Sequence, residues 1–296
     1  MSQPLVSVLT PSFNQARWLG DNLRSVAMQT YSNIEHVVMD GNSTDGSVEL
    51  LAKTKHYIRW DSGADRGQSH ALNKAFSLSR GDIIGWLNSD DAYFDQRAVE
   101  IAVRTFERHP EVDVVYGHAV LVNPEGLIIQ MMWVPPFNYG ILRNHNFIIQ
   151  PSSFIRRSAL GSTVVREAYD YCMDRELWLR LGKDRWFHRV NAILAIDRHH
   201  LTRKSLTRID LKVIDTKRLV AEYGVPQGHI ARARLKVLKV MFRMIGVSLL
   251  PSLNKTNSCG TYQDSLWHLG VRQLAATRAR MPMGRRPAVP SVEAAE

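Results

Sequence analysis

Hydrophobic positions in the first 122 residues follow two alternating patterns. Short apolar runs predict β-strands at 6–9, 34–39, 57–60, 83–87 and 112–122. Between these runs hydrophobic residues recur every three or four positions, as Leu19, Leu23 and Val26 do, and this spacing predicts helices. Strands that alternate with helices indicate the α/β class, with a mainly parallel sheet covered by helices on both faces.

The pattern loosens after residue 125. The sequence still predicts a strand within 148–160, a helix at 171–182 and another strand at 187–197. Residues 208–250 have helical spacing that is interrupted at 223–228. We therefore expect an α/β domain at 1–207, a helical basic extension at 208–280, and a disordered tail at 281–296, which is rich in Pro, Ala and Arg.

The positive charge of the chain is concentrated in its last third. Residues 201–296 contain 17 Lys and Arg against 6 Asp and Glu, a net charge of +11, whereas residues 1–200 carry a net charge of −1. Residues 230–250 combine a basic helix face with an apolar one. This combination suits an anionic membrane surface, or packing on the domain or on another subunit. Because the basic residues match no nucleic-acid-binding module, we expect no nucleic-acid partner.

The ends and the cysteines of the chain bear on its location. The N-terminal segment lacks the features of a secretion signal, and no run of about 18 apolar residues is long enough to span a membrane. The two cysteines, Cys172 and Cys259, have no metal-ligand spacing and are typical of a reducing compartment. We therefore expect a cytoplasmic protein that acts in solution or at the inner face of the cell membrane.

Polar loops follow the first four predicted strands, at 10–14, 40–43, 63–68 and 88–91. Ligands of parallel sheets bind beyond the carboxyl ends of the strands, so these loops are expected to meet at one edge. Two adjacent carboxylates in the fourth loop, Asp90 and Asp91, have two interpretations. They are turn formers, or they hold a divalent cation, Mn²⁺ or Mg²⁺, that also binds substrate phosphates.

Neither GxGxxG nor GxxxxGK[ST] occurs, which disfavours a dinucleotide-dependent oxidoreductase and a P-loop NTPase. Two segments resemble the family 2 glycosyltransferases, which have the Rossmann-like GT-A fold. They are "VSVLTPSFNQARWLGDNLRSVAMQTYSNIEHVVMDGNSTDGSVELL" (6–51) and "ADRGQSHALNKAFSLSRGDIIGWLNSDDAY" (64–93). The resemblance extends over about residues 4–205 and rests on several motifs in the same order.

The resemblance implies a role for each polar loop. The residues that correspond to nucleotide-binding positions are Thr10, Pro11, Phe13, Asp40, Asp65 and Asp90. Among them, Asp40 is expected to contact the base, and Asp90 the ribose or the metal. Asp91 is expected to ligate the Mn²⁺ or Mg²⁺ ion that bridges the diphosphate. Taken without the resemblance, Asp40 is either a turn residue before Gly41 or a carboxylate that accepts hydrogen bonds from a nucleobase or ribose, and Asp65 is a loop residue.

A transferase also needs a base near the acceptor hydroxyl, because an unaided hydroxyl is a poor nucleophile. "DRELWLRL" (174–181) resembles the acidic block of the family, which gives the position of the base to Asp174, with Glu176 as the alternative. An acid at a helix N-terminus is also favoured by the helix dipole alone.

Three further residues have both a functional and a structural interpretation. Trp178 packs in the core, or it forms a platform for the acceptor sugar. Gln150 lies on the acceptor side in the relatives, or it supports the main chain. By resemblance His200, with His199 as the near alternative, reaches the metal or the diphosphate, although a single histidine more often has a structural role.

These implications predict an inverting, metal-dependent glycosyltransferase. Its expected donor is a nucleotide sugar, with UDP favoured, and its expected acceptor is a hydroxyl group in polysaccharide, lipid-linked oligosaccharide or cell-envelope glycan synthesis. The alternative is an inactive module of the same fold that binds a membrane or a partner through its basic extension. A nucleotidyltransferase is disfavoured because "TPSFNQARW" (10–18) is not a phosphate-binding loop rich in glycine and lysine.

Overall fold

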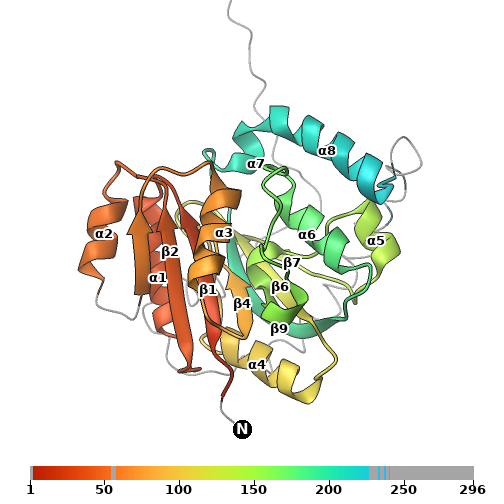
Figure 1. Cartoon of the computed structure of the whole chain (residues 1–296), viewed down its shortest axis with the longest axis horizontal. Helices are drawn as coiled ribbons and strands as arrows, with labels where there is room; N and C mark the ends of the chain where they lie inside the picture. Colours follow the sequence, from red (N-terminus) through yellow and green to blue (C-terminus); the bar gives the residue numbers. More distant parts are fainter. Residues whose placement is uncertain (1–2, 55–57, 227–232, 234–236, 238–239, 241–296) are drawn as a thin grey trace, which may run out of the picture.

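The computed structural model describes residues 3–54, 58–226, 233, 237 and 240 (Figure 1). Its first four strands run parallel in the spatial order β3-β2-β1-β4. They are β1 (Val6–Ser12), β2 (Ile34–Asp40), β3 (Ile58–Ser62) and β4 (Ile83–Trp86). The connecting helices are α1 (Ala16–Ala27), α2 (Ser47–Lys53) and α3 (Gln68–Leu78). The carboxyl ends of the four strands consequently lie along one edge.

Strand β8 (Ser153–Arg156) converts the parallel sheet into a mixed one. It pairs antiparallel with β4 on one side and with β6 (Val114–Val122) on the other. β6 in turn pairs parallel with β9 (Phe187–Arg198). The short strands β5 (Ala92–Tyr93) and β7 (Ile128–Met132) pair antiparallel with β9 and β6. Among the described residues the strands form one nine-stranded sheet, β3-β2-β1-β4-β8-β6-β9-β5, with β7 against β6.

The core contains two large clusters that use opposite faces of the sheet. Val8 and Leu9 of β1 belong to different clusters, because successive side chains of a strand point to opposite faces. Val8 packs in the cluster of α4 (Ala98–Arg108), whereas Leu9 packs in the cluster of α3, α6 (Met173–Leu181) and α8 (Ile209–Tyr223). The remaining helical elements are α5 (Tyr139–Asn144), α7 (Lys204–Thr207) and the 3₁₀ turns η1 (Gln150–Ser152) and η2 (Arg157–Ala159).

Helix α8 packs against the α/β domain (Figure 1). Its buried residues Leu219 and Tyr223 belong to the same core cluster as Leu177 and Trp178 of α6. None of the helices within the described ranges is both long and apolar enough to cross a membrane. The predicted tail at 281–296 and most of the predicted basic helix at 230–250 lie outside the described residues.

The predicted α/β fold is confirmed, and the long predicted strands and helices are present with shifted ends. The short elements β5, β7, α5 and α7 and the two 3₁₀ turns were not predicted. α5 begins at Tyr139, in the stretch after residue 125 where the hydrophobic pattern loosens. β5 has only two residues and exists through its pairing with β9, a non-local contact that no local pattern encodes.

Candidate active site

The loops after the first three strands meet at the carboxyl edge of the sheet. Ser12, Asp40 and Ser62 lie at the same level, because β1 pairs Ser12 with Asp40 and β2 pairs Asp40 with Ser62. A Cβ atom at Gly41 would lie 2.9 Å from Oδ2 of Asp65 and 3.2 Å from the ring of Phe13. The absence of a side chain at Gly41 thus leaves room for Asp65 and Phe13 to approach this loop. Phe13 is 61% exposed and forms an open surface beside them.

The side chains of Thr10 and Asp40 are bound within the fold. The buried Thr10 hydroxyl donates to the carbonyl of Leu87 at 2.7 Å and lies 2.9 Å from Nε2 of His36. Asp40 accepts from the hydroxyl and backbone N–H of Ser43 at 2.5 and 2.9 Å, and from the hydroxyl of Ser62 at 2.7 Å. In this structure both residues shape the loops. A direct contact of either side chain with a nucleotide stays a prediction.

Pro11 and Asp65 have contrasting environments. Pro11 is buried at the end of β1. Asp65 is partly exposed, and its Oδ1 accepts from the N–H of Gly67 at 2.7 Å, at the start of α3. Its Oδ2 is directed toward Gly41 and the exposed ring of Phe13. Phe13 and Asp65 thus both have exposed surface beside Gly41.

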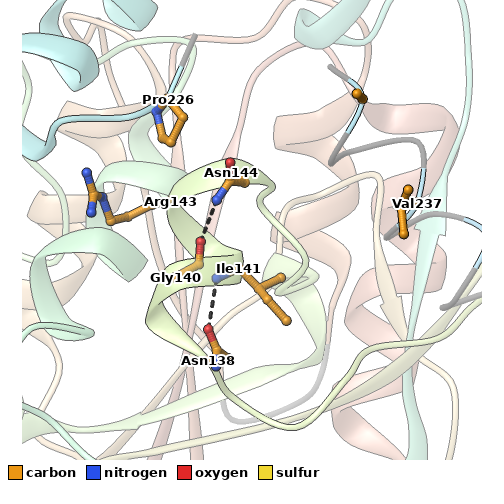
Figure 2. A pocket seen from close by; sticks show the side chains of 8 residues that line it. Asn138, Gly140, Ile141, Arg143, Asn144, Pro226 and Val237 are labelled. Atoms are coloured by element: carbon orange, nitrogen blue, oxygen red, sulfur yellow. Dashed lines mark hydrogen bonds between the residues drawn. The ribbon is translucent and has the colours of Figure 1, made fainter. Parts of the chain in front are cut away.

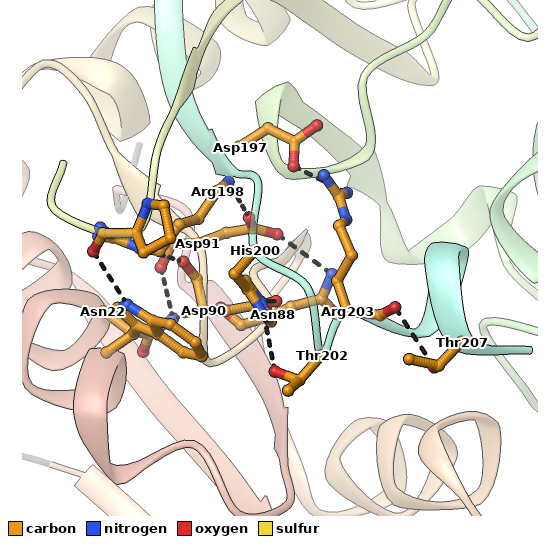
Figure 3. Close-up of polar contacts among 12 residues, drawn as sticks. Asn22, Asn88, Asp90, Asp91, Asp197, Arg198, His200, Thr202, Arg203 and Thr207 are labelled. Carbon is orange, nitrogen blue, oxygen red and sulfur yellow. Dashed lines mark hydrogen bonds and ion pairs between the residues drawn. The ribbon is translucent and has the colours of Figure 1, made fainter. Parts of the chain in front are cut away.

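Asn88 organises the loop that follows β4 (Figure 3). Its Oδ1 accepts from the side chains of Gln68 and Trp86, each at 2.8 Å. Its Nδ2 donates to Oδ2 of Asp91 at 3.2 Å and to Oε1 of Gln150 at 2.9 Å. All hydrogen-bonding groups of the Asn88 amide are therefore used to fix the loop that carries the two carboxylates.

His200 contacts Asp90 directly. Nε2 of His200 lies 2.8 Å from Oδ2 of Asp90, and Nδ1 lies 2.9 Å from the hydroxyl of Thr202 (Figure 3). The imidazole also packs on Trp18 with a centroid distance of 4.1 Å. Both ring nitrogens are thus engaged in the protein, and His200 orients Asp90. The alternative, His199, donates its backbone N–H to Val122 of β6.

Negative charge accumulates around Asp91. Burial raises the pKa of Asp91 well above its ordinary value, and the nearby charges of Asp90 and Asp197 raise it further. Arg203 acts in the opposite direction, but its guanidinium is paired with Oδ1 of Asp197 at 2.9 Å. Burial also raises the pKa of Asp197, and Arg203 partly offsets this effect.

The residues at the end of β4 fit a divalent cation. Within the described part of the chain, Asp91 has no ion pair with a Lys, Arg or His side chain, whereas Asp90 has His200 and Asp197 has Arg203. A cation held by Asp91 and Asp90 would compensate this buried charge and take its other ligands from phosphate and water. No group of three or more His, Cys, Asp or Glu side chains suited to a metal ion occurs among the described residues.

The sequence interpretation missed Arg198, which is almost completely buried behind the carboxylates. Its backbone N–H donates to Oδ1 of Asp91 at 3.2 Å, and its Nε donates to the carbonyl of Asp90 at 3.0 Å. Its Nη2 pairs with Asp21 of α1 at 3.0 Å. Arg198 therefore anchors the carboxylate loop to the end of β9. Its position two residues before His200 was the available signal.

Asp174 lies in the first turn of α6 and is partly exposed. Its Oδ2 accepts from Nδ2 of Asn146 at 2.8 Å. Burial raises the pKa of Asp174, and the hydrogen bonds from the Arg175 backbone and from Asn146 offset part of this effect. A carboxyl group whose pKa is raised toward neutrality is better suited to accept a proton than an ordinary aspartate.

Glu176 is directed into the protein. It is 0% exposed, and its Oε1 accepts from Tyr223 at 2.7 Å and from Arg180 at 3.0 Å. A further ion pair joins it to Arg166 at 3.4 Å. A carboxylate enclosed by two guanidinium groups and a hydroxyl has no access to an acceptor. This geometry supports Asp174 over Glu176 as the base.

Trp178 and Gln150 are also internal. Trp178 is 0% exposed and lies edge-to-face against Phe187, so its ring has no free face for a sugar and the packing interpretation describes it. Gln150 is buried, donates to the carbonyl of Trp86, and accepts from Asn88. Gln150 thus braces the end of β4, and contact with an acceptor stays a prediction.

A separate cavity of about 660 Å³ lies beside α5 (Figure 2). Its lining residues are Asn138, Gly140, Ile141, Arg143, Asn144, Pro226, Ala233 and Val237. None of the residues that the sequence singled out lines this cavity. The arrangement of charged groups points to the carboxyl edge of the sheet as the candidate site.

Residues 7–162 match the model of a family described as Glycosyl transferase family 2. Among curated proteins, the chain is 26% identical to a chondroitin synthase of Escherichia coli, over 71% of this chain and 31% of that protein. It is 28% identical to a hyaluronan synthase of Pasteurella multocida, over 64% of this chain and 20% of that protein. The chain thus spans about a third or less of the length of these relatives.

Solved structures of similar fold carry nucleotide sugars. The structure of S. aureus TarS in complex with UDP-GlcNAc has a TM-score of 0.58 and 16% identity, and covers 73% of this chain and 66% of that one. The mannosyltransferase PcManGT of Pyrobaculum calidifontis, in complex with GDP-Man and Mn²⁺, has a TM-score of 0.54 and 17% identity, and covers 94% of this chain and 81% of that one. At these identities the likeness concerns the fold.

Proposed function

The chain belongs to glycosyl transferase family 2, and we propose that it transfers a sugar from a nucleotide-sugar donor to a hydroxyl acceptor, with inversion at the anomeric carbon and with a divalent cation. UDP is the favoured nucleotide. The acceptor belongs to polysaccharide, lipid-linked oligosaccharide or cell-envelope glycan synthesis, the class to which the chondroitin and hyaluronan synthases point. A lipid-linked acceptor would give the basic segment at 230–250 a role at an anionic membrane surface.

The observation that carries the proposal is the combination of two acidic positions. Asp91 is a buried carboxylate without a cationic partner among the described residues, at the carboxyl edge where the loops of β1 and β2 meet. Asp174 is a partly exposed carboxylate with a raised pKa on α6. Asn146, which donates to Asp174, lies four residues before Gln150, and Gln150 is hydrogen-bonded to Asn88, the donor to Asp91. This connection supports one site that contains both carboxylates.

Each part of the chain has a defined task in this proposal. Phe13 and Asp65 provide the surface for the nucleoside, beside Gly41. Asp91 and Asp90 would hold a divalent cation, which would supply positive charge to the diphosphate leaving group. Asn88, Arg198 and His200 keep these carboxylates in place.

Asp174 accepts the proton of the acceptor hydroxyl. The acceptor oxygen then forms a bond to the anomeric carbon, while the bond from that carbon to the diphosphate oxygen breaks and its electron pair leaves with the nucleoside diphosphate. A single displacement from the opposite face inverts the anomeric carbon. No nucleophile from the protein takes part, so the step requires a base and not a serine or cysteine.

The test is a binding titration followed by a donor screen. We expect UDP to bind with Mn²⁺ and at least about tenfold more weakly after EDTA treatment, because the diphosphate would then face the carboxylates directly. A panel of nucleotide sugars should then give hydrolysis or transfer with one donor. Absence of metal-dependent binding for UDP, GDP and dTDP would overturn the proposal and favour an inactive binding module.

A further inference from the structure

Asn146 makes a specific contact that the resemblance to known glycosyltransferases does not assign. Its Nδ2 donates to Oδ2 of Asp174 at 2.8 Å. Among the described residues, Asn146 is the one whose side chain donates a hydrogen bond to the Asp174 carboxylate. Oδ1 of Asp174 has no side-chain donor among the described residues. The two oxygens of Asp174 therefore differ in their side-chain partners.

The segment around Asn146 is held rigidly at both ends. Before it, α5 is joined to α6 by a hydrogen bond of 2.9 Å from Nη2 of Arg175 to the carbonyl of Arg143. After it, Phe147 and Ile148 are buried in the core, and Gln150 binds Trp86 and Asn88 at the end of β4. Five residues thus connect the carboxylate of α6 to the loop of Asp90 and Asp91.

The close approach of α5 and α6 depends on Gly182, the residue that ends α6. A Cβ atom there would lie 3.0 Å from the rings of both Phe137 and Tyr139. Glycine lets the end of α6 lie against the start of α5, which in turn places Asn146 near the first turn of α6. The contact between Asn146 and Asp174 is therefore built into the packing of two helices.

We propose that Asn146 is a positioning residue for the base: it holds Oδ2 of Asp174 and leaves Oδ1 to take the acceptor proton. This inference rests on the proposed function. The amide donor favours the ionised carboxylate, which is the form that accepts a proton. A second consequence is orientation, since a carboxylate with one fixed oxygen has lost its rotation about the Cβ–Cγ bond.

The kinetic test uses Asn146→Ala, with Asn144→Ala as its matched control. The Asn144 amide donates to Gly140 inside α5 and makes no described contact with Asp174. We expect Asn146→Ala to lower kcat by about tenfold to hundredfold, with an unchanged KM for the donor and unchanged binding of UDP. The acid limb of the kcat–pH profile should move to higher pH, because a hydrogen bond to the ionised form is lost.

Asn146→Asp gives a second, nearly isosteric variant. It places a carboxylate beside Asp174, so the acid limb should move further to higher pH than in Asn146→Ala. A purely structural role would lower stability without moving this limb. A kcat within about twofold of the wild type and an unmoved profile in both variants would overturn the proposal.

A titration independent of activity separates this proposal from the proposed function. Carbon-13 NMR of aspartate carboxyl groups would follow Asp174, whose signal is identified by its absence in Asp174→Asn. We expect a higher titration midpoint in Asn146→Ala than in the wild type. An unchanged midpoint overturns the role of Asn146, whatever the activity. If Asn146→Ala raises the titration midpoint of Asp174 but the wild-type protein transfers no sugar, the proposed function is overturned. The contact between Asn146 and Asp174 is then still supported.

Discussion

The hydroxyl of Tyr223, the last residue of α8, lies 2.7 Å from Oε1 of Glu176 on α6. The same buried oxygen forms ion pairs with Arg180 at 3.0 Å and with Arg166 at 3.4 Å. Arg166 also pairs with Glu222, the neighbour of Tyr223. One buried carboxylate therefore joins α8, which follows the matched region of the chain, to the helix that carries Asp174.

Tyr223→Phe should destabilise the protein by about 1–3 kcal/mol, because Glu176 keeps its buried charge and loses a donor. Urea unfolding monitored by tryptophan fluorescence measures the change. Tyr139→Phe is the control, since the hydroxyl of Tyr139 makes no hydrogen bond to a described residue. Equal stabilities for Tyr223→Phe and the wild type would show that the contact does not hold α8 on α6.

Asp174→Asn and Glu176→Gln should affect catalysis differently. Asp174→Asn should lower turnover by about a thousandfold or more while UDP binding persists, because it removes the base and not the nucleotide site. Glu176→Gln should lower stability, yet its folded fraction should retain turnover within about tenfold of the wild type, because Glu176 is enclosed by Arg166, Arg180 and Tyr223. Initial rates of both variants, measured at saturating donor and acceptor, show which of the two carboxylates is needed for catalysis. If Asp174→Asn transfers sugar at a near-normal rate, Asp174 is not the base.

The sequence predicted the order of strands and helices well, because these elements carry local periodicity. It also predicted that the loops of β1 and β2 meet, since parallel strands end at a common edge. It could not place β8 antiparallel between β4 and β6, because that pairing joins residues about 70 positions apart in sequence: Gly85 with Phe154. Non-local pairing of this kind leaves no periodic signal.

Candidate site residues could be predicted from the sequence where the residue type itself indicates the chemistry. They were harder to predict where the role of a residue depends on the residues packed around it. Asp90 and Asp91 stood out as adjacent acids after an apolar run, whereas Asp174 was indicated by the resemblance of "DRELWLRL" to the acidic block of the family. By contrast, Glu176 and Asp174 have the same chemistry two residues apart, and only the packing of Arg166 and Tyr223 reveals that Glu176 is internal. Asn146 carries no charge and lies in a stretch without regular pattern, so its contact with Asp174 was visible only in three dimensions.

Asp91→Asn should abolish the metal dependence of UDP binding. The amide loses the charge that a divalent cation requires, so affinity in Mn²⁺ should fall by at least about tenfold. The affinity should then no longer change when EDTA is added. Glu167→Gln is a suitable control, because Glu167 forms an exposed pair with Arg66 on the surface. Isothermal titration with UDP measures both, and an unchanged affinity for Asp91→Asn would refute its role as a ligand.

Acid sensitivity of the fold should depend on His36. The Thr10 hydroxyl donates to Leu87, so Thr10 accepts from Nε2–H of a neutral His36. Burial lowers the pKa of His36 from 6.5 to about 3. Because the folded-state pKa lies below the unfolded one, stability is complete above about pH 6.5. It is lost by about 1.4 kcal/mol per pH unit as the pH falls toward 3.

His36→Gln keeps a donor for Thr10 but cannot take up a proton. Between about pH 6 and pH 4 the dependence of the unfolding free energy on pH should therefore flatten by up to about 1.4 kcal/mol per pH unit. Some dependence should remain, because burial also lowers the pKa of His118, to about 4. Urea unfolding at several pH values measures the slope. If the slope of the variant equals that of the wild type, His36 is not protonated on unfolding, and another group causes the loss of stability in acid.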